Sequence, residues 1–76
     1  MAMIDMSDKL AIMPQGDAII TVDGATFTVP AMTPFTSSSQ QIDVAAGTVL
    51  AIMYNTQSPH GKILQIFSID EIMTVA

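Results

Sequence analysis

The stretch Asp17–Pro30, D-A-I-I-T-V-D-G-A-T-F-T-V-P, decides the fold because it has the pattern of a complete β-hairpin with its turn included. A two-residue type I′ turn needs φ > 0 at both central residues, and Asp23-Gly24 is a pair that this turn favours. Once the turn is fixed, the register of the two strands follows from it. The predicted facing pairs are Val22–Ala25, Thr21–Thr26, Ile20–Phe27, Ile19–Thr28 and Ala18–Val29.

The two faces of this hairpin differ in polarity. Successive side chains of a strand point to opposite faces, so every second residue shares a face. The apolar face holds Ala18, Ile20, Val22, Ala25, Phe27 and Val29. The other face holds Ile19, Thr21, Thr26 and Thr28. A slip of one residue would mix the two sets, so the register is strongly specified.

Other apolar segments, separated by turn residues, continue the β pattern. Thr48–Asn55 (T-V-L-A-I-M-Y-N) is almost continuously apolar, which predicts a strand buried on both faces. Lys62–Ile69 (K-I-L-Q-I-F-S-I) is a second long segment, and we expect it to pair antiparallel with the first. A brief strand is predicted at Ile42–Val44. Lys9–Met13 is interpreted as a short strand stopped by Pro14, with one turn of helix as the alternative.

The two ends of the chain are less clearly patterned. Residues 1–8 are expected to be frayed or docked on a partner. Near the other end, Ser68-Ile69-Asp70-Glu71 fits a helix capping box, so residues 69–75 are compatible with a short helix. The alternative is a bend at Asp70-Glu71 followed by a strand at Ile72–Ala76, which we favour because most of the chain is β.

Turn and loop chemistry separates these segments. Pro30 and Pro34 exclude a central strand between them and predict an extended edge or a rigid crossover. Thr36–Gln41 (T-S-S-S-Q-Q) is expected to be an exposed loop, and Asn55–Gly61 is rich in turn residues. The residues predicted to form structural turns are Asp23, Gly24, Gly47 and Gly61.

These patterns together predict one all-β domain over residues 1–76. Short strands at this spacing are typical of a small barrel or sandwich. We expect five to six short, mostly antiparallel strands, with one short C-terminal helix as the open alternative.

The charge balance disfavours two classes of partner. The net charge is −5, and Lys9 and Lys62 are the two basic residues. Binding to nucleic acid through phosphates needs a basic stripe, and anionic membrane surfaces also attract basic residues. The longest apolar run, Val49–Tyr54, is too short to cross a bilayer, and the first residues lack the basic region of a signal peptide. We expect neither nucleic acid nor a membrane as partner, and a cytoplasmic protein or a virion component.

No catalytic, cofactor-binding or metal-binding residue is predicted. The chain has no cysteine and one histidine, His60, so a zinc site would need mostly carboxylate ligands. His60 is the residue to consider as a general base, but no nucleophile motif accompanies it. Asp70 and Glu71 are neighbours, and consecutive strand residues point to opposite faces. We therefore predict that the protein is not an enzyme.

The composition instead favours assembly. Half of the residues are apolar and 12% are charged, against about a quarter in typical domains. So small a domain, without disulfides, usually needs further stabilisation, and oligomerisation can supply it. We predict a structural or interaction module that self-associates or docks on a larger assembly. The residues expected at its contact surface are Met32, Phe35, Met53 and Tyr54.

The alternative is a small ligand- or peptide-binding barrel of the OB or SH3 type. Its groove would be rimmed by the loops at residues 30–41 and 55–61. An aromatic-lined cleft would distinguish it, and the chain has four aromatic residues.

Two fragments are similar to short stretches of phage head-decoration proteins. They are Pro30-Ala31-Met32-Thr33-Pro34 and Ala46-Gly47-Thr48-Val49-Leu50, so the resemblance covers ten of 76 residues, all of common types. Proteins of that family are small, all-β and trimeric, and they bind the outside of capsids. The resemblance implies a phage particle as one possible larger assembly.

Overall fold

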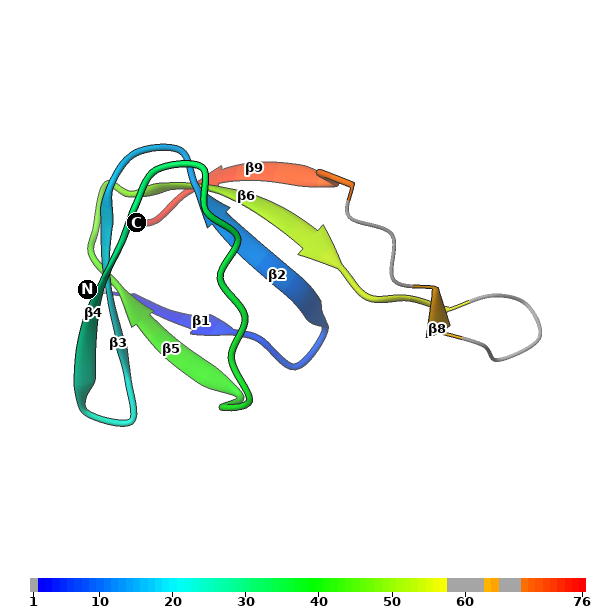
Figure 1. Cartoon of the computed structure of the whole chain (residues 1–76), viewed down its shortest axis with the longest axis horizontal. Helices are drawn as coiled ribbons and strands as arrows, with labels where there is room; N and C mark the ends of the chain where they lie inside the picture. The colour runs from blue at the N-terminus through cyan, green and yellow to red at the C-terminus, as the bar shows by residue number, and fades with distance from the viewer. Residues whose placement is uncertain (1, 58–62, 65–67) are drawn as a thin grey trace.

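The structure, a computed structural model, describes residues 2–57, 63–64 and 68–76. In these residues the chain is all-β and folds into two antiparallel sheets that face each other, as in a small sandwich or barrel (Figure 1). The predicted fold class is therefore confirmed. Seven strands make up the two sheets, rather than the five to six expected.

The first sheet has four strands in the order β1-β5-β3-β4. Their bounds are Ala2–Asp5 for β1, Gln41–Val44 for β5, Ala18–Val22 for β3 and Ala25–Val29 for β4. The second sheet has three strands in the order β2-β6-β9, which span Lys9–Pro14, Val49–Tyr54 and Glu71–Thr74. A separate two-stranded sheet pairs β7 (Thr56–Gln57) with β8 (Ile63–Leu64) and lies beyond the end of β6 (Figure 1).

The β3–β4 hairpin has the predicted register at all five facing pairs, from Val22–Ala25 at the turn to Ala18–Val29. Asp23 and Gly24 adopt φ values of 50° and 81°, as a type I′ turn requires. On the polar face, the hydroxyls of Thr21 and Thr26 lie 3.2 Å apart. Local turn chemistry thus sets the register of this half of the first sheet.

The hairpin extends further than the layer that should cover its apolar face. Ala18, Ile20 and Val29 are buried, as predicted. Ala25 and Phe27 share that face but are exposed, and Phe27 keeps 48% of its surface in solvent. The alternation of side chains gave the face correctly, but β4 lies at the edge of its sheet, where the opposite sheet does not cover it.

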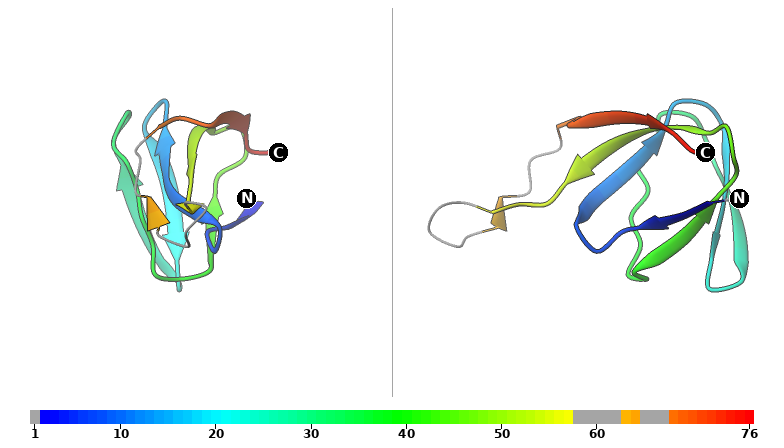
Figure 2. Two further views of the ribbon diagram at one scale, coloured as in Figure 1. Left: turned by 90° about the vertical axis from the view of Figure 1, so that its right-hand side faces the viewer. Right: turned by 180° about the vertical axis from the view of Figure 1, so that it is seen from behind.

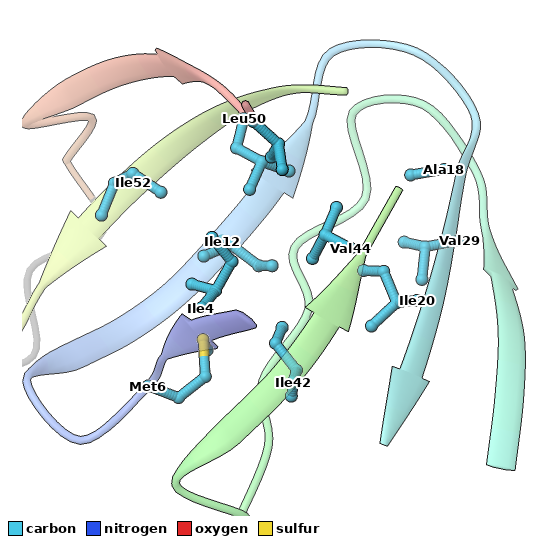
Figure 3. Close-up of a cluster of buried hydrophobic side chains, with 11 residues drawn as sticks. Ile4, Met6, Ile12, Ala18, Ile20, Val29, Ile42, Val44, Leu50 and Ile52 are labelled. Carbon is cyan, nitrogen blue, oxygen red and sulfur yellow. The ribbon is translucent and has the colours of Figure 1, made fainter. Parts of the chain in front are cut away.

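The core fills the space between the two sheets (Figure 3). Ile20, Ile42 and Val44 come from the first sheet and meet Ile12 and Ile52 from the second. The other buried members of this cluster are Ile4, Met6, Ala18, Val29, Leu50 and Val75. These residues are mostly β-branched, and such side chains pack well on a pleated surface.

The start of the chain corrects one expectation. Residues 2–5 are not frayed: they form β1, which pairs antiparallel with β5 from Ala2–Val44 to Asp5–Gln41. Ile4 and Met6 reach the core, which explains why this poorly patterned segment is ordered. The next prediction, a strand from Lys9, is confirmed, although Pro14 ends β2 as its last residue.

The pairing of β6 corrects a second expectation. Leu50–Met53 is buried on both faces, as predicted, but β6 pairs with β2 and β9. Of the predicted strand Lys62–Ile69, β8 pairs with β7 instead, while residues 62 and 65–67 lie outside the described residues. The edge of β6 is taken by β9, which brings Met73 and Val75 to the core.

Two further predictions concern the last residues and the turns. Glu71–Thr74 is a strand, so the strand alternative is confirmed and the short helix is wrong, although the strand includes Glu71 and ends at Thr74 rather than spanning Ile72–Ala76. Gly47 has a φ of 89° in the turn before β6, as expected of a turn glycine. Gly61 lies outside the described residues.

Candidate interaction surface

The two sheets end in four strand edges, and residues 2–57, 63–64 and 68–76 cover one of them. Phe35 bridges the outer edge of β2: its N–H donates to the Ile12 carbonyl at 2.7 Å, and the Ile12 N–H donates back at 3.0 Å. For β1, β4 and β9, the described part of the chain places no strand on the outer edge. Figure 2 shows β4 at the margin of the molecule. Unpaired edges present backbone N–H and C=O groups that can pair with another chain.

Each of these three outer strands also exposes a large apolar side chain. Met3 on β1 is 56% exposed, Phe27 on β4 is 48% exposed and Ile72 on β9 is 57% exposed. Ile19, on the outer face of β3, is exposed as well. Single apolar side chains at a surface are ordinary, but here they lie on strands whose outer edges have no neighbouring strand among the described residues.

The three edges differ in charge. β1 ends in Asp5 and β9 begins with Glu71, whereas the sequence of β4, A-T-F-T-V, has no charged residue. Charges on an edge strand discourage another chain from pairing with it. β4 therefore stands out as the edge without this protection.

A polar cluster links β9 to the end of β6. The Tyr54 hydroxyl donates to Glu71 Oε1 at 2.5 Å, and the Tyr54 N–H donates to Asp70 Oδ2 at 3.0 Å. Lys9 Nζ lies 5.4 Å from the centroid of the Tyr54 ring. The hydrogen bond to Glu71 and the nearby carboxylates favour the neutral phenol, which raises the pKa of Tyr54 to about 12. Asp70 and Glu71 therefore accept hydrogen bonds from Tyr54, and Glu71 does not form the helix capping box considered from the sequence.

A second polar contact fixes the end of β1. The Ser7 backbone N–H donates to Asp5 Oδ1 at 2.8 Å. This bond, together with the Ser7 hydroxyl and a smaller contribution from Lys9, lowers the pKa of Asp5 from its ordinary value. Ser7 and Lys9 thus favour the charged form of Asp5 at the end of β1.

The structure separates the four residues predicted for the contact surface. Met32 is exposed and adopts a φ of 61°, and its N–H donates to the Pro14 carbonyl at 2.7 Å. Phe35 and Tyr54 are half-buried and pack against the core. Met53 is 4% exposed, so in this conformation it is not accessible to a partner. Only Met32 is prominent at the surface.

Sequence reasoning missed Phe27 as a surface residue, because alternation placed it with the core. The signal that could have identified β4 as an edge strand is Pro30, which directly follows Val29. That pattern fits an edge strand, which tolerates a nearby proline.

Two shallow hollows lie on the surface, and no aromatic residue lines either of them among the described residues. One is formed by the outer face of the first sheet and the loop before β5, and includes Met3, Thr21, Asp23 and Asp43. In it, the Ser39 hydroxyl donates to Asp23 Oδ2 at 2.5 Å. The other lies between the turns that contain Gly16 and Gly47. Neither has the aromatic lining expected of a peptide-binding groove.

Within residues 2–57, 63–64 and 68–76, no three acidic or histidine side chains lie close enough together to hold a metal ion. His60 lies outside these ranges. The same part of the chain includes no helix long and apolar enough to cross a bilayer.

Comparisons of the chain with protein-family models, with curated proteins and with solved structures find no match.

Proposed function

We propose that this protein is a non-enzymatic structural module that self-associates or docks on a larger assembly. The observation that carries this proposal is that, in the described part of the chain, β1, β4 and β9 each combine an outer edge that has no neighbouring strand with an exposed apolar side chain. Natural proteins usually cover or protect such edges. A partner strand would satisfy the backbone groups and cover the apolar side chains in one step.

The composition supports the same proposal. A chain of 76 residues buries only about 60–65% of the surface that it exposes when unfolded. Without disulfides, contacts between subunits are a common further source of stability. The similarity of two short fragments to phage head-decoration proteins makes a phage capsid the first larger assembly to test.

The binding-barrel alternative has weaker support. Its groove would need aromatic or basic residues, and the two surface hollows contain neither. Three of the four aromatic residues, Phe27, Phe35 and Tyr54, lie on different elements of the described chain, and none of them lines either hollow.

Size-exclusion chromatography with light scattering tests the proposal. The expected result is a molar mass that rises with concentration above the 8.1 kDa of one chain. A constant mass of one chain, combined with full thermal stability in isolation, would overturn self-association and count against the need for a larger assembly. A weak interface needs a broad range of loading concentrations, up to about 1 mM.

A further inference from the structure

We propose that β4 pairs antiparallel with β4 of a second copy of this chain, about a two-fold axis at Phe27. The proposal rests on the proposed function and names the edge and the register through which the module self-associates. The paired strands would join two four-stranded sheets into one continuous sheet.

β4 is the least protected of the three outer strands. Proline, charge and bulges are the usual protections of an edge strand. β4 has none of them between Ala25 and Val29, and its register with β3 is regular along its whole length. In contrast, Asp5 and Glu71 place a charge on β1 and β9. In a chain with a net charge of −5, two copies repel each other least along an uncharged strand.

The hydrogen-bonding pattern of the β3–β4 hairpin decides which backbone groups of β4 point outward. In an antiparallel hairpin with a two-residue turn, the pair next to the turn exchanges hydrogen bonds, and bonded and non-bonded pairs then alternate. Ala25, Phe27 and Val29 therefore direct their backbone groups towards β3, while Thr26 and Thr28 direct theirs outward. The 3.2 Å approach of the Thr21 and Thr26 hydroxyls fits a non-bonded pair, in which side chains lie closer.

The outward backbone groups of Thr26 and Thr28 set the register between the two copies. Pairing Thr26 with Thr28 of the other copy, and Thr28 with Thr26, matches outward groups with outward groups. The centre then falls on Phe27, which faces its own equivalent as a non-bonded pair, where side chains lie closest. At the ends, Ala25 faces Val29. The strand A-T-F-T-V thus pairs like with like: threonine with threonine, and apolar with apolar residues.

The surroundings of β4 allow this arrangement. The carboxylates of Asp17 and Asp23 lie beyond the ends of the paired strands: continuing the register places Asp23 of one copy opposite Ala31 of the other, whose N–H donates to Asp17 Oδ1. The two-fold axis makes the contact isologous and closed, which gives a dimer rather than a filament. A single five-residue strand buries little surface, so we expect a dissociation constant on the order of 100 μM.

The first test removes an outward N–H. In Thr28→Pro, the proline ring removes a backbone N–H that faces only the outer edge of β4. The dissociation constant of the dimer should therefore rise by about tenfold or more. Thr28→Val keeps both the N–H donor and a β-branched side chain, so its dissociation constant should stay within about threefold of that of the unchanged chain. Sedimentation equilibrium over about 10 μM to 1 mM measures the three dissociation constants. Circular dichroism checks that each variant is folded.

The second test is disulfide trapping, and it stands even if Thr28→Pro does not fold. The chain has no cysteine, so a single one can be introduced. Two-fold pairing brings the position-27 side chains of two copies together, and Phe27→Cys should form a dimer rapidly on mild oxidation. The matched control is Ile19→Cys, because Ile19 is similarly exposed but lies on β3.

The outcomes separate this inference from the proposed function. Weaker pairing in Thr28→Pro, or faster trapping of Phe27→Cys than of Ile19→Cys, supports pairing through β4. If the unchanged chain associates but the two cysteine variants are trapped equally fast and Thr28→Pro pairs normally, the inference is wrong and the proposed function stands. If the chain is monomeric throughout, both the inference and self-association are wrong.

Discussion

Two uncharged strands of this protein, β6 and β4, have opposite surroundings. In β6, the four residues Leu50–Met53 are buried. In β4, the four residues Ala25–Thr28 are exposed. β6 lies between β2 and β9 in the middle of its sheet, so its apolar sequence is explained by burial within the chain. β4 is an edge strand, and no contact among the described residues explains why it has no charge.

The comparison shows that an uncharged strand has different meanings at the centre and at the edge of a sheet. At the centre, substitutions should act on the stability of the fold. At an edge, they should act mainly on association with other chains. The following predictions test this division, beginning with the largest effect.

The largest difference is expected between Ile52→Ala in β6 and Phe27→Ala in β4. Ile52 is fully buried in the core, so truncation should lower the free energy of unfolding by about 3 kcal/mol. Phe27 is half exposed, so its truncation should lower it by less than about 1 kcal/mol. Urea denaturation at a concentration where the chain is monomeric measures both values. Equal losses in the free energy of unfolding would show that Phe27 contributes to the core as Ile52 does, and β4 would then not differ from β6 in this respect.

The sequence predicted the β3–β4 hairpin because its determinants are local. Asp23-Gly24 fixes the turn, the turn fixes the register, and alternation then sorts the side chains. The pairing of β1 with β5, and of β6 with β9, depends on segments far apart in the sequence, so no local pattern specifies it. We expected β6 to pair with the next apolar segment, because antiparallel neighbours are often consecutive.

The candidate surface was less predictable than the fold. Alternation assigned Phe27 to the apolar face, but it cannot say how far the opposite sheet extends over that face. Met53 was expected at the surface because methionine is common at adaptable interfaces, and the central position of β6 buries it. Which strands lie at the edges is decided by the whole topology, and the interaction surface depends on that choice.

An intermediate effect is expected at the turn that holds β4 in register. Gly24 has a φ of 81°, and a Cβ added there would meet no atom within 4 Å. Gly24→Ala should therefore lower stability through its backbone conformation alone, by about 1 kcal/mol. Gly16 is equally open but does not adopt a positive φ, so Gly16→Ala should be neutral or stabilise by about 0.5 kcal/mol. Thermal denaturation of the two variants provides the comparison, and a similar loss in both would contradict the role of the turn.

The smallest effect concerns the charged edge at β9, which differs from β4 in having Glu71. Tyr54 is the single tyrosine of the chain, so its ionisation can be followed by ultraviolet absorbance. We expect an apparent pKa of about 12, against an ordinary value of 10.0, because its hydroxyl donates to Glu71. Glu71→Gln removes the charge and should return the pKa towards 10.0.

The same hydrogen bond has a consequence for stability at high pH. Because folding raises the pKa of Tyr54, its contribution to stability is complete below pH 10 and is lost as the pH rises from 10 to about 12. The loss of stability over this pH range should be smaller in Glu71→Gln. Urea denaturation of both proteins at a series of pH values measures the difference. If the titration of Tyr54 is unchanged in that variant, Glu71 does not hold the phenol. The carboxylate would then be available only to repel an approaching strand, as an edge charge does.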